Sequence, residues 1–187
     1  MTTASPFTTP RSTQTLARRL WRILRHRWAD GSLRQTLPPD MRERLGQRVA
    51  ASERRHTGQI RICVEGGLPL SYLWRDASAR ERAVTQFGKL RVWDTERNNG
   101  VLIYLLLADH AIEIVADRGL AQHVPQQVWS ALLTRMGEAF RAARYEDGLT
   151  QALAEVSALL VAHFPRDPSH KPGAASNELP DAPVIGY

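Results

Sequence analysis

An unbroken apolar and aromatic run at residues 101–107 constrains the fold of this chain more than any other segment. The run is too short to span a bilayer, which requires about 20 apolar residues in a helix. It follows the turn-forming pair Asn99-Gly100 and does not alternate with polar residues. We therefore expect a strand that is covered on both faces, and such a strand predicts an α/β layer architecture.

The patterns around this run predict the remaining elements. Alternation over 60–64 predicts a half-buried strand, and residues 112–116 are expected to return beside 99–108 as a hairpin. Apolar residues at helical spacing predict helices that begin near Pro39, Ser78, Pro125 and Leu149. We expect a three-layer α/β/α sandwich in which helices flank a small mixed sheet with a β-α-β-β core. Its first two strands should be parallel and its third antiparallel.

The chain is expected to divide into three regions. Residues 1–36 form a basic arm with an amphipathic helix over 15–29, residues 37–164 form the α/β domain, and residues 165–187 form a disordered, proline-rich tail. The arm contains seven arginines and one aspartate of the chain's 25 basic and 19 acidic residues, so the rest is neutral. Because a nucleic-acid-binding body would carry its own basic face, we expect no nucleic-acid partner.

The composition also indicates a compartment. A single cysteine excludes an internal disulfide and is typical of a reducing environment. Arginines interrupt the N-terminal apolar segment, so we expect neither a signal peptide nor a transmembrane segment. These features predict a cytoplasmic protein that attaches peripherally to the inner membrane through its basic helix.

The helix predicted over 15–29 has an apolar side and an arginine-rich side. We expect it to contact an anionic lipid surface or a membrane-associated protein, with packing on the domain as the alternative. The residues of this candidate surface are Leu16, Arg18, Arg19, Trp21, Arg22, Arg25 and Trp28. The apolar connection 68–75 is expected either to close over the end of the sheet or to form a partner patch through Leu70, Tyr72 and Trp74.

Several short segments, in this order, resemble the TPM domain family, small α/β domains of bacterial envelopes and chloroplasts. They are 53–60 (ERRHTGQI), 99–103 (NGVLI), 112–114 (IEI), 118–120 (RGL) and 145–149 (YEDGL), and the resemblance spans about residues 37–160. The resemblance implies several functions. A plant member of the family is a weak acid phosphatase, other members bind calcium or magnesium, and others are accessory subunits of membrane complexes.

Two departures from the family pattern bear on this implication. The family often has an acidic pair before the first helix, which residues 31–36 lack, and commonly has an acid where this chain has Asn98. We therefore expect a non-enzymatic interaction module that docks at membrane-associated partners. The alternative is a weak acid phosphatase, a phosphomonoester hydrolase that depends on a divalent metal.

Oxygen-bearing side chains are expected to meet where the first two strands begin and the third ends. Carboxylate and amide oxygens there could hold Ca²⁺ or Mg²⁺, and a guanidinium beside them could hold phosphate. The same residues could instead form a solvated turn. The candidate metal ligands are Asp94, Glu96, Asn98 and Asp117, and Arg118 is the candidate catalytic residue. Cys63 is expected to be a packed thiol, and the six histidines are expected at the surface or in turns.

Overall fold

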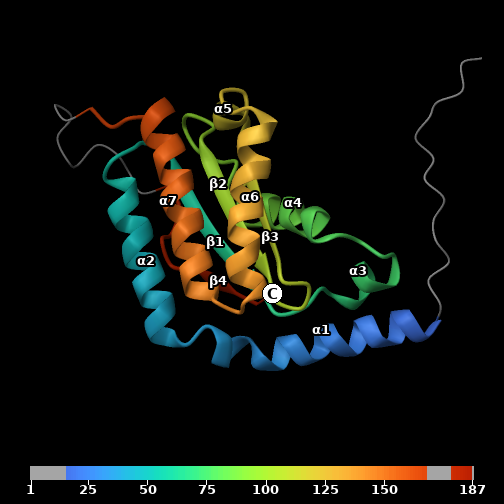
Figure 1. Cartoon of the computed structure of the whole chain (residues 1–187). Coiled ribbons are helices and arrows are strands. Elements are labelled where there is room, and N and C mark those ends of the chain that lie inside the picture. The colour runs from blue at the N-terminus through green and yellow to red at the C-terminus, as the bar shows by residue number, and fades with distance from the viewer. Residues whose placement is uncertain (1–15, 168–177, 187) are drawn as a thin grey trace, which may run out of the picture.

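The computed structural model describes residues 16–167 and 178–186, in which a four-stranded sheet lies between two helical layers (Figure 1). The strands are β1 (Gln59–Glu65), β2 (Gly100–Leu106), β3 (Ala111–Ala116) and β4 (Val184–Ile185), in the order β3-β2-β1-β4. β1 is parallel to both β2 and β4, whereas β3 is antiparallel to β2. The predicted α/β sandwich with a small mixed sheet is confirmed.

β2 is buried along its whole length. Its odd-numbered residues enter the core on one face of the sheet, and its even-numbered residues enter the core on the other face. A helical layer covers each face, so neither set of side chains meets water. This two-sided burial explains why the run 101–107 lacks the alternation of a half-exposed strand.

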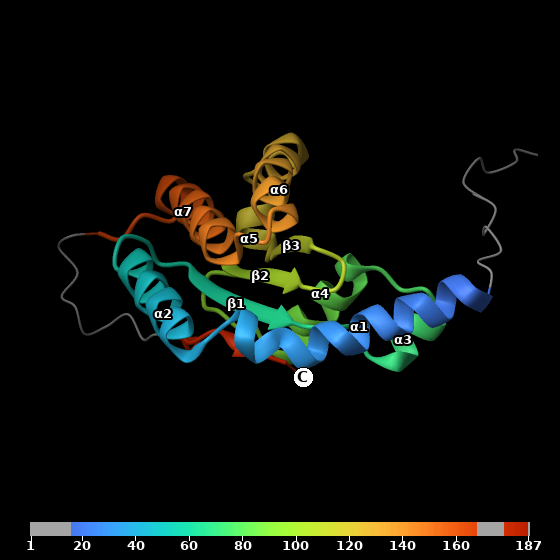
Figure 2. The same ribbon diagram turned by 60° about the horizontal axis from the view of Figure 1, so that its bottom comes forward.

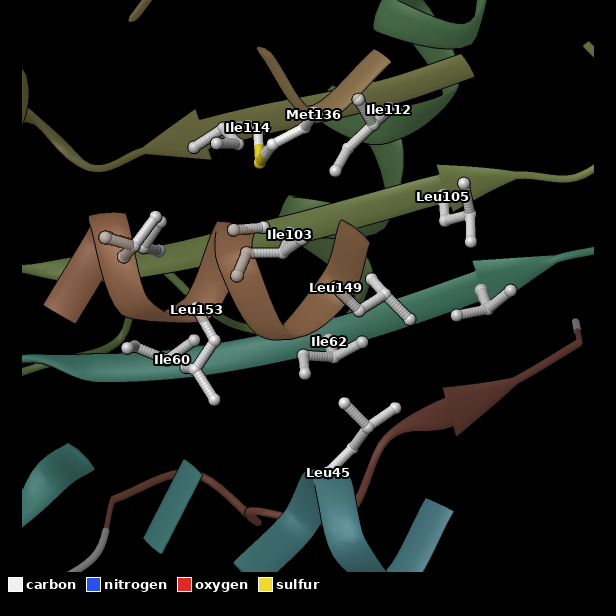
Figure 3. Packing of buried hydrophobic residues seen from close by; sticks show 14 of the residues in the cluster. Leu45, Ile60, Ile62, Ile103, Leu105, Ile112, Ile114, Met136, Leu149 and Leu153 are labelled. Carbon is white, nitrogen blue, oxygen red and sulfur yellow. The ribbon is translucent and has the colours of Figure 1, made fainter. Parts of the chain in front are cut away.

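The helices divide between the two faces of the sheet. One face is covered by α2 (Pro39–Glu53), α6 (Gln126–Arg141) and α7 (Tyr145–His163), and the other by α3 (Leu70–Trp74) and α4 (Ala79–Lys89). A short helix, α5 (Arg118–Ala121), follows β3. Figure 3 shows the core between the sheet and the α2, α6 and α7 layer, in which Leu45 of α2 and Leu153 of α7 approach Ile60 and Ile62 of β1.

The first helix, α1 (Leu16–Thr36), lies along the edge at which the parallel strands end (Figure 2). The sequence predicts that it ends at residue 29, but it continues for seven further residues. Glycine within a helix costs about 1 kcal/mol, and Gly31 favours an early end. Burial of Leu33 and Leu37 offsets this cost, since each is almost fully removed from water.

Part of the tail that was expected to be disordered packs on the sheet. Residues 178–186 contain β4, which pairs with β1. The side-chain oxygen of Gln59 accepts the backbone N–H groups of Glu178 and Leu179, both at 3.1 Å, and Leu179 is buried. The partners that fix this segment come from β1, so local composition alone could not reveal them. Residues 168–177 of the predicted tail lie outside the described residues.

Candidate functional site

The side of α1 that faces the sheet carries polar side chains beside the buried Leu33. His26 is fully buried, its Nδ1 accepts the backbone N–H of Leu68 at 3.0 Å, and its Nε2 lies 3.3 Å from a carboxylate oxygen of Asp109. Asp30, one turn further along α1, accepts the backbone N–H of Gly67 at 2.6 Å. A Cβ atom on Gly67 would collide with the backbone of His26. The glycine therefore allows α1 to approach this closely.

Arginines of α1 add ion pairs to this contact. Arg22 pairs with Asp76 and donates to the carbonyl of Ala77 at 2.8 Å, and Arg25 pairs with Asp109. Burial raises the pKa of Asp109, but hydrogen bonding by His26 and the charges of the arginines lower it more, so it stays below its usual value. One side of α1 is thus packed on the domain, which is the alternative that the sequence left open.

The opposite side of α1 carries an exposed apolar surface, which we call the α1 stripe. It consists of Leu20, Trp21, Leu24 and Trp28, which are 62, 63, 59 and 82% exposed. At 100° per residue the stripe is centred opposite His26. On the same projection Arg18 and Arg25 border it on one side, and Arg27 and Arg34 on the other.

The other predicted residues of this surface differ in position. Arg19 is exposed, Arg22 is half-buried in its ion pair, and the side chain of Leu16 lies outside the described part. Within residues 16–167 and 178–186, no helix has both the length and the apolar character that a bilayer crossing requires. The exposed apolar surface of α1 is thus a stripe along one side of the helix and not a membrane-spanning segment.

The apolar connection after β1 contributes to both the core and the surface. Leu68 and Leu73 are buried, which closes the end of the sheet, whereas Leu70 and Trp74 are exposed. The third predicted patch residue, Tyr72, is half-buried, and its hydroxyl lies 2.8 Å from that of Thr85. α3 contacts α1, and Leu70 and Trp74 are exposed apolar side chains of α3 in addition to the α1 stripe.

Three of the five residues predicted to form a metal and phosphate site lie together at the amino edge of the sheet. Arg118 donates to the side-chain oxygen of Asn98 at 2.9 Å. One carboxylate oxygen of Asp117 accepts the backbone N–H of Arg118 at 2.7 Å, and the other is buried without a hydrogen-bond partner in the described residues.

The other two predicted ligands are exposed. Asp94 pairs with Arg91 at 2.5 Å, whereas the contact of Glu96 with Glu178 is made by its backbone N–H and not by its carboxylate. In the described ranges, no three His, Cys, Asp or Glu side chains form a group that could hold a metal ion. Binding of Ca²⁺ or Mg²⁺ at this edge stays a prediction.

Two histidines that were expected at the surface or in turns, His26 and His56, are fully buried. The Nε2 of His56 lies 2.9 Å from the hydroxyl of Ser52, and its Nδ1 lies 3.1 Å from the carbonyl of Gly58. Burial, together with the charges of Arg55 and Arg166, lowers the pKa of His56 to about 4. The i, i+4 spacing of Ser52 and His56 was a signal for this pair that could have been recognised.

Sequence reasoning also missed a buried polar network around the last residue of β1. The carboxylate of Glu65 accepts two hydrogen bonds from Arg82, at 2.8 and 2.5 Å. It accepts one more from Gln86 at 2.7 Å and one from the hydroxyl of Tyr104 at 2.6 Å. Nearby Cys63 is fully buried, and burial raises the pKa of its thiol to about 12. The prediction of a packed thiol is confirmed.

Comparison with known proteins identifies a family that matches the chain and a solved structure with a similar fold. The sequence profile of the TPM domain matches residues 33–159, more than half of the chain, and the α1 stripe precedes the matched region. A search of curated proteins finds no match. The structure is similar to the NMR structure of the BA42 protein from the psychrophilic bacterium Bizionia argentinensis, with a TM-score of 0.66 over 79% of this chain and 93% of that one. The two sequences are 22% identical, so this likeness shows a common fold alone.

Proposed function

The chain belongs to the TPM domain family, and we propose that this member is an interaction module that docks on anionic membranes through the α1 stripe. The observation that carries the proposal is the orientation of α1. Its polar side is fixed to the domain by His26 and Asp30, which leaves the side with two tryptophans and two leucines in solvent. An amphipathic helix that packs on its own domain would normally turn its apolar side inward.

The borders of the stripe favour a lipid surface. Arginines on both sides of an apolar strip can place their stems along the acyl boundary and their guanidinium groups among the phosphates. Arg25 also lies over the ring of Trp21, with its Cζ 5.6 Å from the centroid. Tryptophan is enriched at membrane interfaces because its ring is amphipathic.

The apolar and electrostatic contributions to docking are comparable in size. Full burial of one large apolar side chain contributes roughly 1.5–3 kcal/mol. Each arginine near an anionic leaflet contributes about 1 kcal/mol. Docking should therefore require both the stripe and anionic lipid, and it should weaken as salt screens the arginines.

Flotation of the full chain with vesicles tests this proposal. We expect the protein to float with phosphatidylglycerol vesicles and to stay at the bottom with phosphatidylcholine vesicles. The double substitution Trp21→Ser and Trp28→Ser should weaken binding by roughly a hundredfold, because two ring burials are lost. Trp93→Ser is the matched control, since Trp93 is half-exposed but lies before β2 at the opposite edge of the sheet.

The flotation result can also contradict the proposal. Equal flotation of the double variant and the native chain would exclude the stripe as the docking surface. Capture of a protein partner by the stripe, without binding to either vesicle, would overturn the lipid assignment.

The alternative function is a weak, metal-dependent phosphatase at the amino edge. The unpartnered carboxylate oxygen of Asp117 next to Arg118 supports it, because a cation held there would polarise an attacking water while the guanidinium stabilises the phosphoryl oxygens. Its support is weaker, since Asp94 is paired with Arg91 and the side chain of Glu96 is exposed. Hydrolysis of p-nitrophenyl phosphate that requires Mg²⁺ and is lost in Asp117→Asn would favour it, and hydrolysis unaffected by a chelator would exclude it.

A further inference from the structure

A cavity of about 330 Å³ lies where α1 crosses the carboxyl edge of the sheet. Its walls include the end of β1, at Glu65 to Gly67, and Gly186 directly after β4. The chain runs from β1 outward to β2 and β3 and then returns to β4 on the other side of β1. Ligands of open α/β sheets bind outside the carboxyl ends of strands where the strand order reverses in this way.

Glycines bring the backbone close to the cavity. Gly66, Gly67 and Gly186 line it, and Gly186 has a φ of +69°, a conformation that side chains disfavour. The volume is at the lower end of the range for small-ligand sites. The cavity therefore fits a compact polar group and not a large cofactor.

Two opposite charges from α1 line this cavity. Arg27 makes no ion pair with any residue in the described ranges, so its guanidinium is available to an anion. Asp30 uses Oδ1 to accept the N–H of Gly67, which leaves Oδ2 for a donor. A ligand that satisfies both groups carries a phosphate or carboxylate and an ammonium group with N–H bonds.

The position of the cavity on α1 indicates the source of such a ligand. On the helical projection, Leu33, Asp30 and Arg27 follow one another from the buried side of α1 to the border of the stripe. Leu70, which is exposed, also lines the cavity. If the stripe lies on a bilayer, the Arg27 end of the cavity is at the level of the lipid headgroups.

We propose that this cavity binds the phosphoethanolamine headgroup of a membrane lipid, with Arg27 on the phosphate and Asp30 on the ammonium group. The inference rests on the proposed function for its orientation and names a lipid specificity within it. A choline headgroup has the same phosphate and positive charge, but its quaternary nitrogen has no N–H to donate to Asp30. Ethanolamine lipid is therefore favoured over choline lipid at equal anionic content.

Vesicles that differ in one component test the headgroup. We expect the full chain to bind phosphatidylglycerol vesicles roughly tenfold tighter when the second lipid is phosphatidylethanolamine than when it is phosphatidylcholine, the effect of one charge-assisted hydrogen bond. Asp30→Asn should remove this preference, since the amide oxygen can still accept from Gly67 while the charge is lost. Arg34→Gln is the control, an exposed arginine on the same border of the stripe but outside the cavity.

A titration with soluble glycerophosphoethanolamine separates the cavity from the membrane surface. We expect NMR shifts at the amides of Gly66, Gly67 and Gly186, absent with glycerophosphocholine and absent in Asp30→Asn. Equal vesicle affinities, or no shifts, would overturn the headgroup assignment and leave the docking proposal intact. Shifts with the soluble headgroup but no binding to any vesicle would overturn membrane docking and keep the cavity assignment.

Discussion

The carboxyl and amino edges of the sheet both carry charged residues, but the charges are partnered differently. At the carboxyl edge Glu65 pairs with Arg82 and His26 contacts Asp109, both across long stretches of chain and largely out of water. At the amino edge Asp94 pairs with Arg91 three residues away, and both are exposed. Buried long-range pairs fix the position of secondary structure, whereas exposed local pairs contribute little to it.

The difference in pairing distinguishes charges that hold the fold together from charges that are available to bind a ligand. The carboxyl edge is held by pairs that are already satisfied, so its remaining charges, Arg27 and Asp30, stand out as available to a ligand. The amino edge has more candidate ligands in sequence, but Asp94 is already paired with Arg91 and the side chain of Glu96 is exposed. The two edges therefore differ in how their charged side chains are paired in the fold, and not in the number of acidic residues.

The largest expected contrast is between the ion pairs of the two edges. Arg82→Met leaves the Glu65 carboxylate buried without its cation, so the free energy of unfolding should fall by about 3–5 kcal/mol. Asp94→Asn breaks an exposed pair and should change it by less than about 1 kcal/mol. Urea denaturation measures both values. Similar losses in the two variants would remove the distinction between the edges.

Lowering the pH should destabilise the folded chain at the amino edge by protonating His56. Its pKa in the folded chain is about 4, below the ordinary 6.5, so the unfolded chain binds more protons between these values. The contribution of His56 to the free energy of unfolding should therefore fall as the pH drops from about 6.5 to 4, by on the order of 3 kcal/mol. The contribution of Glu53 to the free energy of unfolding changes with pH in the opposite direction. Burial raises its pKa to about 8, so its contribution is present below pH 4.5 and is lost as the pH rises to 8.

Comparison of the native chain with His56→Gln isolates the histidine. The variant should lose the part of the pH dependence between 6.5 and 4 that is due to His56 and retain the part due to Glu53. Unfolding in urea at several pH values gives both profiles. Parallel profiles would show that His56 titrates alike in the folded and unfolded chains.

A smaller loss is expected where α1 is fixed to the carboxyl edge. His26→Ala removes the acceptor for the Leu68 N–H and leaves a gap beside Asp109, so the free energy of unfolding should fall by roughly 2 kcal/mol. Hydrogen exchange at Leu68 should accelerate at the same time. His110→Asn is the control, because His110 is exposed and its left-handed backbone conformation suits asparagine. Unchanged exchange at Leu68 would show that His26 does not fix α1.

Much of the sheet could be predicted from the sequence because its signals are local. The run 101–107 indicated a strand buried on both faces, and the two-residue alternation of 60–64 indicated its parallel neighbour. β4 had no such signal, since two residues in a proline-rich tail become a strand only when β1 offers its edge. Among the candidate ligands, the meeting of Asn98 and Arg118 followed from strand order, whereas the pairing of Asp94 with Arg91 depended on a loop conformation.

By itself, the sequence predicted a helix over 15–29 with an apolar and a basic side, because a period of 3.6 residues is a property of the chain alone. Only the tertiary structure decided which side faces the domain. Hydrophobicity would place the apolar side inward, but the buried N–H groups of Leu68 and Gly67 and the half-buried carboxylate of Asp109 are partners for the polar side. Satisfying those groups holds the polar side against the sheet, and the tryptophans remain in solvent.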